Sequence, residues 1–552
     1  MYEPVIQNIK DWPIARIARH QDEILEDVTE ESIQQLDAIS TESKRDLVAK
    51  ALYLERIRIK NEPWDVDPED ESEFWGKIKK KLSSYDPNTS PKEEAEKIED
   101  ALIRDIVKRY SEEIINNFDP KLYRFAEQVL PIFFGRLLNA SIGGLKSIFK
   151  PKTSLTDKLF ITGPIDKIRK LSTKGTVILV PTHFSNLDSI LIGYGMDMIG
   201  LPAFQYGAGL NLFNSRIFGF FMGNLGAYRV DRRKKNTIYL ETLKAFSRIN
   251  VYKGAHTIFF PGGTRSRAGN LENFLKLGLV GTVIDAQRMH FENNPDGAAP
   301  KIFILPLTTS YHFVLEASSL ISEHLKRMGK EQFLLPDDQF QSYKAIAKFF
   351  WGLFGSSSDI TLSLSEPMDI FGNQLDDEGN SIDKFGNPID IKKYFVSNGE
   401  IIKDPQRDHV YTQMLGDFIL EKFHTGNTVY SSHLVTFVAF EILRKRYAGN
   451  DIFTILRTPE DEREIPWDEY IFACNRVRDA LYHLNNQHKV KLAPHMTLEM
   501  DEIIEHGIRN VNTYHPIKPI VRMKNGNISS EDLKLLFFYH NRLEGYDLQK
   551  CI

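Results

Sequence analysis

The feature that most constrains the fold is an alternation of short apolar runs with segments of helical period between residues 126 and 404. The runs TVILVPT, TIFFPGG and KIFILPLTTSY are each followed by a stretch with apolar residues at helical spacing. Strands that alternate with helices in this way form βαβ units, in which neighbouring strands run parallel. The sequence therefore predicts an α/β domain at 126–404, with a mostly parallel sheet flanked by helices.

The regions on either side of this block have a different sequence pattern. Residues 1–125 are polar and charged, with apolar positions such as Leu102 and Ile106 on one helical stripe. Residues 405–552 contain long segments of helical period, among them HLVTFVAFEILRKRYAG. We therefore expect a helical N-terminal region at 1–125 and a helical C-terminal domain at 405–552, in keeping with the roughly two to four folding units that this length allows.

Composition argues against several classes of function. The formal net charge is -5, whereas a general nucleic-acid binder presents a basic surface, so we expect no nucleic-acid partner. Cys474 and Cys551 are the only cysteines, and they lie too far apart in the sequence to suggest a disulfide framework or a Cys-based metal site. No His-rich or Asp-rich ligand motif occurs either, so neither a metal nor a cofactor is expected.

Charge and hydropathy also suggest where the protein works. The segment MYEPVIQNIKDWPIARIARHQDE has no apolar stretch behind a basic start, and no uninterrupted apolar run reaches the eighteen or so residues needed to span a bilayer. Residues 129–152 and 343–355 combine large apolar side chains with Lys or Arg, as interfacial helices do, although packing on the α/β core is an equal alternative. We expect a cytoplasmic protein that binds the inner face of the cell membrane peripherally.

The first candidate site lies where the run VILVPT ends. His183 follows this predicted strand, and Asp188 lies five residues later at the start of a helical pattern. At this spacing the carboxylate can accept the Nδ1 proton and leave Nε2 as a general base. No G-x-S-x-G elbow occurs and neither cysteine lies near a suitable histidine, so the attacking hydroxyl must come from a substrate. On spacing alone, a histidine that only caps a strand end fits equally well.

The second candidate site is the loop FFPGGTRSRAGN, which follows another predicted strand. Its glycines let backbone amides approach an anion, and Arg265 and Arg267 can form charge-assisted bonds to phosphate oxygens. The loop matches neither G-x-G-x-x-G nor a Walker loop, so it does not indicate nucleotide binding. A solvated basic turn is the alternative interpretation.

Together these segments resemble the glycerol-3-phosphate and 1-acylglycerol-3-phosphate acyltransferase family, whose four ordered blocks all occur between residues 183 and 316. The His-x4-Asp block corresponds to His183 and Asp188, and GAYRVDR resembles the second block with its arginine at Arg232. FPGGTRSR resembles the third block, F-P-E-G-T-R-S-R, at Gly263, Thr264, Arg265, Ser266 and Arg267. ILPLTTSYHFVLEA resembles the fourth, with Pro306 and Tyr311 at the proline and aromatic positions.

The resemblance implies an O-acyltransferase in phospholipid biosynthesis that uses no cofactor beyond its thioester co-substrate. Its donor would be acyl-ACP or acyl-CoA and its favoured acceptor the hydroxyl of glycerol 3-phosphate. His183 and Asp188 would be catalytic, and the substrate-binding residues would be Arg232, Gly263, Thr264, Arg265, Ser266 and Arg267. A lysophosphatidate or other lysophospholipid acceptor is the alternative, and a catalytically silent membrane-surface adaptor is a third possibility.

One departure bears on the acceptor. Gly262 stands where the third block of the family has a glutamate, which puts the identity of the acceptor in doubt. A second observation concerns the donor, because LPAFQYGAGLNLFNSRIFGFFMGNLGAY is crowded with Phe and includes Met222. Such side chains suit a flexible alkyl chain, but ordinary core packing explains them at least as well.

Overall fold

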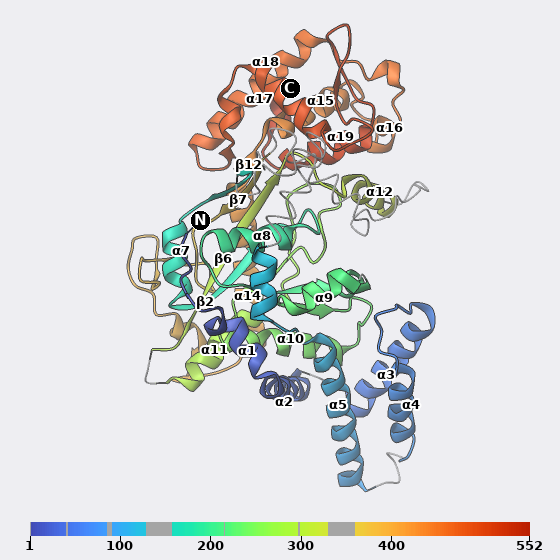
Figure 1. The fold of residues 1–552 in the computed structure, drawn as a ribbon, viewed down its shortest axis with the longest axis vertical. Helices are drawn as coiled ribbons and strands as arrows, with labels where there is room; N and C mark the ends of the chain where they lie inside the picture. The colour runs from blue at the N-terminus through green and yellow to red at the C-terminus, as the bar shows by residue number, and fades with distance from the viewer. Residues whose placement is uncertain are drawn as a thin grey trace.

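A seven-stranded sheet occupies the middle of the chain in the computed structural model, which describes residues 2–39, 42–85, 91–128, 157–214, 216–295, 298–328 and 359–552 (Figure 1). The strands lie in the order β1-β7-β6-β2-β5-β3-β4, and all neighbours are parallel except β6 and β7. Their bounds are Leu159–Thr162 for β1, Gly175–Pro181 for β2, Gln205–Gly209 for β3, Ala227–Val230 for β4, Thr257–Ile258 for β5, Lys301–Tyr311 for β6 and Ile360–Leu364 for β7. The predicted α/β class with a mostly parallel sheet is confirmed.

The central strands β2 and β6 are buried on both faces of the sheet. Every residue of 176–181 and 302–311 is buried, as expected for the nearly continuous apolar runs of parallel strands. The two strands pair in register from Gly175 opposite Lys301 to Pro181 opposite Leu307. Because β5, β3 and β4 run parallel to β2, the segments that follow all these strands emerge at one edge of the sheet.

Alternate residues of β2 face opposite sides of the sheet, and different helices cover each side. Val177 and Leu179 pack in one apolar cluster with α8 (Asp188–Met198) and α12 (Ala317–Arg327). Ile178 and Val180 pack in another with α11 (Thr282–Asn293) and α14 (Pro405–Thr425). The other helices of this part are α7 (Ile165–Ser172), α9 (Arg216–Asn224) and α10 (Thr237–Tyr252). The sheet is therefore the middle layer between helices.

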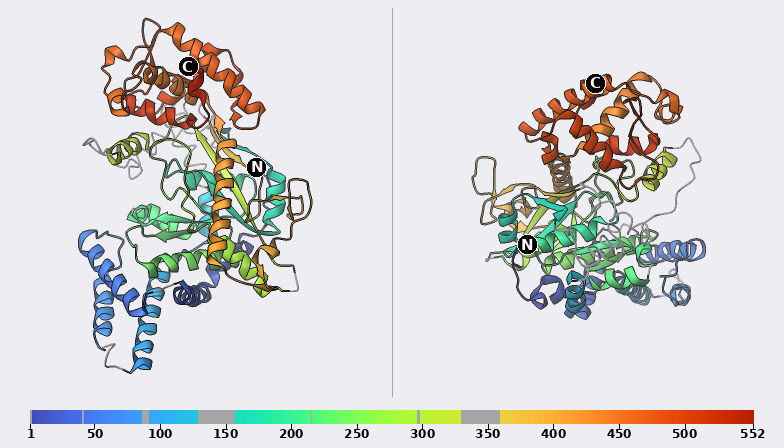
Figure 2. Two further views of the ribbon diagram at one scale, coloured as in Figure 1. Left: turned by 180° about the vertical axis from the view of Figure 1, so that it is seen from behind. Right: turned by 45° about the horizontal axis from the view of Figure 1, so that its top comes forward.

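The N-terminal region is helical, as predicted, and packs on the sheet domain through α10. Its elements are the 3-10 helix η1 (Ile9–Asp11), α1 (Pro13–Arg19), α2 (Gln21–Ile39), α3 (Lys44–Asn61), α4 (Glu71–Leu82) and α5 (Lys92–Ile114). The rings of Tyr110 in α5 and Tyr239 in α10 meet edge to face with their centroids 5.2 Å apart. Figures 1 and 2 show α3, α4 and α5 extending away from the sheet, at the end opposite the C-terminal helices.

The C-terminal region is also helical, and its central helix is α15. They are α15 (Ser431–Arg446), α16 (Ile452–Leu456), α17 (Trp467–Asn486), α18 (Met500–Asn512) and α19 (Leu533–His540). Residues 431–443 of α15 are all buried, and their apolar cluster is continuous with the one that contains Val177 and Leu179. Helix α14 begins just past residue 404 and packs on the sheet. The domain boundaries at 125 and 404 stay predictions, while the packing joins the sheet and the C-terminal helices in one core.

Short elements complete the described part of the chain. The two-residue strands are β8 (Gln374–Leu375), β9 (Ser381–Ile382), β10 (Val396–Ser397), β11 (Glu400–Ile401), β12 (Thr428–Val429), β13 (Lys491–Leu492), β14 (Val521–Arg522) and β15 (Ile528–Ser529). The remaining 3-10 helices are η4 (Leu210–Asn214), η6 (Ile391–Phe395), η7 (Glu460–Glu462), η8 (Pro494–Thr497), η9 (Asn541–Leu543) and η10 (Leu548–Cys551).

The predicted membrane contacts at 129–152 and 343–355 lie outside the described residues. Among the helices that are described, none has the length and apolar character needed to cross a membrane.

Arg542 ties the C-terminal region to the end of strand β6. Its guanidinium is buried, donates hydrogen bonds to the Thr309 carbonyl (2.6 Å) and to Asn427 Oδ1 (2.9 Å), and lies over the Phe184 ring. Burial lowers the pKa of Arg542 to about 10. Because these acceptors are buried with it, they would lose their donor if the side chain were removed.

We therefore expect Arg542→Ala to lower the free energy of unfolding by about 3 kcal/mol, since it combines unsatisfied buried acceptors with a cavity. Urea denaturation followed by circular dichroism measures the change. The matched control is Lys550→Ala, because Lys550 is 71% exposed and its surface ion pair with Asp547 is worth about 0.5 kcal/mol or less. Equal losses in the two variants would contradict this account of Arg542.

Candidate active site

The structure brings His183 and Asp188 together at the carboxyl edge of the sheet. His183 follows the end of β2, a short turn reverses the chain, and Asp188 is the first residue of α8. The distance from His183 Nδ1 to Asp188 Oδ2 is 2.8 Å. Because an ionised carboxylate only accepts hydrogen bonds, Nδ1 carries the proton and Nε2 keeps its lone pair. The two side chains that the sequence pairs by spacing are therefore arranged as a base and its orienting acid.

Asp188 is fully buried, and its carboxylate is held by three further donors. Oδ2 also accepts from the backbone N–H groups of Phe184 (2.7 Å) and Ser185 (3.0 Å). Oδ1 accepts from the Tyr311 hydroxyl at 2.5 Å. Burial, with Asp188 alongside, raises the pKa of Tyr311 well above its ordinary value, so this phenol stays a neutral donor. Tyr311 was placed in the fourth block by resemblance alone, and its bond to Asp188 was not predicted.

The loop after β5 holds the backbone of His183 on both sides. The His183 carbonyl accepts from the Ser266 backbone N–H at 2.7 Å, and the His183 N–H donates to Glu272 Oε1 at 2.8 Å. The imidazole also lies against Phe260, with the ring centroids 4.3 Å apart. Ser266 was predicted to bind substrate, but its hydroxyl bonds to the Asn270 carbonyl (2.8 Å) and its amide supports His183. The loop therefore fixes the position of the histidine as well as lining the site.

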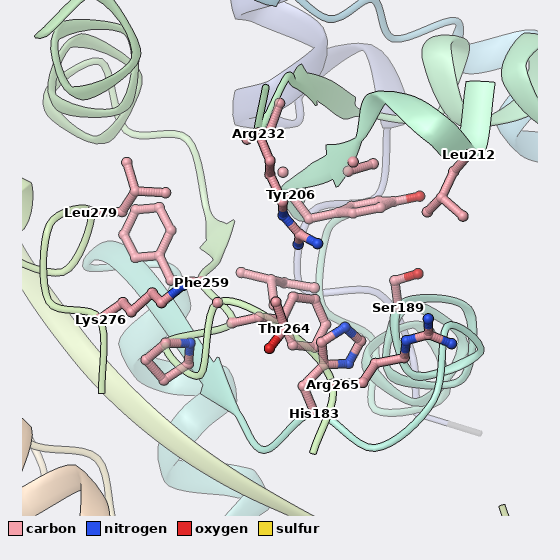
Figure 3. Close-up of a pocket in the computed structure, with 18 of the residues that line it drawn as sticks. His183, Ser189, Tyr206, Leu212, Arg232, Phe259, Thr264, Arg265, Lys276 and Leu279 are labelled. Carbon is pink, nitrogen blue, oxygen red and sulfur yellow. The ribbon is translucent and has the colours of Figure 1, made fainter. Parts of the chain in front are cut away.

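His183 opens onto a cavity of 380 Å³ that gathers most of the predicted binding residues (Figure 3). Arg232, Gly263, Thr264, Arg265 and Arg267 all line it. In Figure 3 the guanidinium of Arg232 reaches from the β4 side toward His183. Partial burial and the positive charges of Arg265 and Arg267 lower the pKa of Arg232 from its ordinary value. Segments far apart in the sequence thus place three guanidinium groups around one cavity.

The three arginines differ in how their charge is balanced. Arg265 forms an ion pair of 3.0 Å with the buried Glu316, and Arg267 forms one of 2.9 Å with Glu323. Arg232 has no ion-pair partner within the ranges that the structure describes, and the charges that act on it are those of Arg265 and Arg267. A guanidinium without a carboxylate is more available to a bound anion, because its field is not offset nearby. Arg232 is therefore the strongest candidate to meet a phosphate.

Glu316 is a site residue that the sequence did not identify. It is buried and accepts hydrogen bonds from the Ser185 hydroxyl (2.8 Å) and the Asn186 N–H (3.0 Å) in addition to its pairing with Arg265. Burial raises the pKa of Glu316 from its ordinary value. Its place near the end of ILPLTTSYHFVLEA, the segment that resembles the fourth block, is the one signal that could have suggested it.

The backbone conformation at position 263 favours glycine. Its φ is +69°, a left-handed backbone conformation that favours glycine, and a Cβ there would lie 2.5 Å from Lys276 Cδ. Lys276 itself lines the cavity and is a second residue that the sequence did not single out.

One wall of the cavity is apolar. It is formed by side chains from β3, η4, α9, β4, α10 and the segment before α11, including Leu212, Met222, Leu243, Leu279 and Val280. Met222 belongs to the Phe-rich stretch that suggested an acyl-chain lining, whereas Phe204 from the same stretch is buried in the core. The stretch thus contributes both to the cavity and to ordinary packing.

Elsewhere, His312, His495 and His506 each place one ring nitrogen within 4.8 Å of the others. At His495, a hydrogen bond competes with a metal ion for the ring nitrogen. His495 Nε2 accepts the backbone N–H of Ser431 at 3.0 Å, so its lone pair is occupied and Nδ1 carries the proton of the neutral ring. Burial lowers the pKa of His495 to about 3, which keeps the ring neutral.

Comparison with known proteins agrees with this geometry. Residues 165–310 match the model of the acyltransferase family. This segment is an acyltransferase domain. It contains His183, Asp188, all three arginines and the loop between β5 and α11, whereas Tyr311, Glu316 and Glu323 lie just beyond it.

Curated relatives carry the name glycerol-3-phosphate acyltransferase. The protein from Pseudomonas aeruginosa is 25% identical over 270 residues, which are 48% of this chain and 28% of that protein. The one from Aeromonas hydrophila is 28% identical over 229 residues, covering 41% of this chain and 25% of the relative. The one from Haemophilus ducreyi is 31% identical over 169 residues, covering 30% and 20%. The chain thus matches about a quarter of the length of these relatives.

The bond from Tyr311 to Asp188 generates a stability prediction for the acyltransferase domain. Tyr311→Phe removes a donor to a buried carboxylate, so we expect it to lower the free energy of unfolding by about 1.5–3 kcal/mol. Tyr482→Phe is the control, because that half-buried hydroxyl donates to the neutral Met496 carbonyl at 2.9 Å and should cost about 1 kcal/mol or less. Urea denaturation of both variants measures the difference, and a Tyr311→Phe protein as stable as wild type would contradict the prediction.

Proposed function

We propose that the chain is an O-acyltransferase that moves a fatty acyl group from a thioester, acyl-ACP or acyl-CoA, to the hydroxyl of glycerol 3-phosphate. The observation that carries the proposal is the pairing of His183 with Asp188 at a cavity that Arg232, Arg265 and Arg267 also line. The base suits removal of a hydroxyl proton, and the arginines suit a phosphate on the same acceptor. The names of the curated relatives support this acceptor.

In the proposed reaction, His183 Nε2 takes the proton of the acceptor hydroxyl as its oxygen attacks the thioester carbonyl. The C–S bond then breaks, an ester forms, and the imidazolium returns its proton to the leaving thiolate. Asp188 stabilises the imidazolium and keeps the proton on Nδ1 in the resting state. No acyl-enzyme is needed, because the cavity brings the hydroxyl and the thioester together beside the base.

The cavity divides naturally between the two substrates. The phosphate of the acceptor would lie against Arg232 and near Lys276, and the apolar wall with Leu243 and Met222 would contact an acyl chain. Lysophosphatidate, the alternative acceptor, carries the same phosphate together with an acyl chain of its own. Because the product is a lipid, we also propose that the enzyme works at the inner face of the cell membrane.

The first test concerns the base. We expect His183→Ala to lower kcat by at least about a hundredfold, because it removes the general base while leaving the fold intact. The assay follows thiol release from acyl-CoA or acyl-ACP with glycerol 3-phosphate, lysophosphatidate or glycerol as acceptor. His409→Ala, an exposed histidine on α14, is the control and should match wild type. An active His183→Ala enzyme contradicts the assignment, and wild-type protein that releases no thiol with any acceptor favours the adaptor alternative.

The second test concerns the phosphate. Arg232→Ala should raise the KM for glycerol 3-phosphate about tenfold to hundredfold, since a hydrogen bond to a charged group contributes roughly 1.5–3 kcal/mol. The effect on kcat should be smaller, because the contact is present in both the ground state and the transition state.

Arg229→Ala is the matched control for the phosphate test. Arg229 lies three residues earlier, its guanidinium lies over the Phe213 ring, and it does not line the catalytic cavity. Its KM should stay within about twofold of wild type. Equal turnover of glycerol and glycerol 3-phosphate by the wild-type enzyme would show that the arginines do not recognise a phosphate.

A further inference from the structure

Glu272 is a buried acid next to the catalytic histidine that the proposed reaction does not use. It lies in the loop between β5 and α11. Oε1 accepts the backbone N–H of His183 at 2.8 Å. Oε2 is buried and has no hydrogen-bond partner within the described part of the chain. Burying a carboxyl oxygen without a hydrogen-bond partner costs folding free energy. The presence of Glu272 at this position therefore needs a physical explanation.

Gly262 supplies part of that reason. A Cβ built on Gly262 would lie 3.3 Å from both Cγ and Oε1 of Glu272. The backbone at Gly262 is not left-handed, unlike that of Gly263, so its conformation does not require a glycine. The Glu272 side chain therefore packs closely against position 262, and a larger residue there would require it to shift. In the family that this sequence resembles, the third block has a glutamate at the position that corresponds to Gly262.

We propose that Glu272 is a positioning residue for His183 and supplies, from ten residues further along the chain, the carboxyl that the third block otherwise carries at position 262. This inference rests on the proposed function, since positioning the base matters for turnover only if His183 is the base. Gly262 and Glu272 are then a reciprocal pair: the glycine makes room for the displaced carboxyl.

The geometry explains how Glu272 would act. The peptide groups on either side of His183 are held at two points, its carbonyl by the Ser266 amide and its N–H by Glu272. Loss of one point lets the imidazole shift relative to a bound hydroxyl, and a displacement of about 1 Å can lower turnover by roughly a hundredfold. Burial raises the pKa of Glu272 to about 7, with Arg542 lowering it and Asp188 raising it. Both the acid and its ion keep an oxygen that accepts from His183.

Two variants of Glu272 and one control variant on α11 test the proposal. Glu272→Ala should lower kcat by about tenfold to hundredfold with little change in the acceptor KM, because it disturbs the base and leaves the arginines in place. Glu272→Gln should recover most of the activity, since the amide oxygen still accepts from the His183 N–H. Glu292→Ala on α11, which removes a surface acid paired with Arg288, is the matched control and should match wild type.

The reciprocal exchange separates a positioned carboxyl from a residue that is needed only for folding. Glu272→Gly should be impaired, and Gly262→Glu alone should be impaired because its side chain meets Glu272 at 3.3 Å. Gly262→Glu combined with Glu272→Gly restores the carboxyl from the other position and should be at least fivefold more active than Glu272→Gly. A double variant no better than Glu272→Gly, or a Glu272→Ala enzyme with wild-type kcat, overturns the proposal.

Hydrogen–deuterium exchange gives a readout that does not depend on catalysis. The His183 amide should exchange at least tenfold faster in Glu272→Ala than in wild type, and at close to the wild-type rate in Glu272→Gln. Unchanged exchange in the Ala variant overturns the positioning role even if activity falls. The two proposals can also fail separately. If the wild-type protein shows no acyl transfer but the His183 amide still exchanges faster in Glu272→Ala, Glu272 supports His183 and the proposed function is rejected.

Discussion

The buried carboxylate of Asp188 is the group on which the geometry of the cavity depends. An anion removed from water must be matched by donors, and Asp188 receives them from His183 Nδ1, two backbone amides and the Tyr311 hydroxyl. The amides belong to the turn between β2 and α8, so the turn and the direction of the imidazole are fixed together. Tyr311 is the last residue of β6, and its carbonyl accepts a hydrogen bond from His433 Nε2 of α15 at 3.0 Å. The position of the base therefore depends on the β2–β6 register and on the C-terminal helices.

Around this anchor the cavity distributes charge unevenly. Glu316 and Glu323 pair with Arg265 and Arg267, which fixes the direction of those side chains and offsets part of their field. Arg232 enters from β4, on the other side of the cavity, and no carboxylate offsets its charge in the described residues. A phosphate bound there would face one free guanidinium and two that are held in place. This arrangement favours recognition by position as well as by charge, because the ion pairs orient the two paired arginines.

The N-terminal and C-terminal regions contribute differently to the domain that they flank. The C-terminal helices share an apolar core with the sheet and place Arg542 over Phe184, inside the His-x4-Asp segment itself. The N-terminal helices pack on α10 and have their own apolar cluster with Tyr110 and Tyr239. Changes in the C-terminal region should therefore reach the base through direct contacts. The N-terminal region contacts the wall of the cavity chiefly through α10, which carries Leu243 on its inner side.

The sequence by itself determined the features that depend on neighbours along the chain. Strand and helix periodicity gave the α/β class, five-residue spacing joined His183 to Asp188, and contiguity placed Arg265 and Arg267 in one loop. Only the tertiary structure decided which acidic side chains bond to these residues. Glu316 meets Arg265 from 51 positions away, and Glu272 meets the His183 amide from 89. Gly262 looked like a missing acid in the sequence, yet the structure brings another carboxyl against it. Such pairings follow from strand register and from the packing of loops at a shared sheet edge, which bring together residues whose separation in the sequence carries no periodic signal.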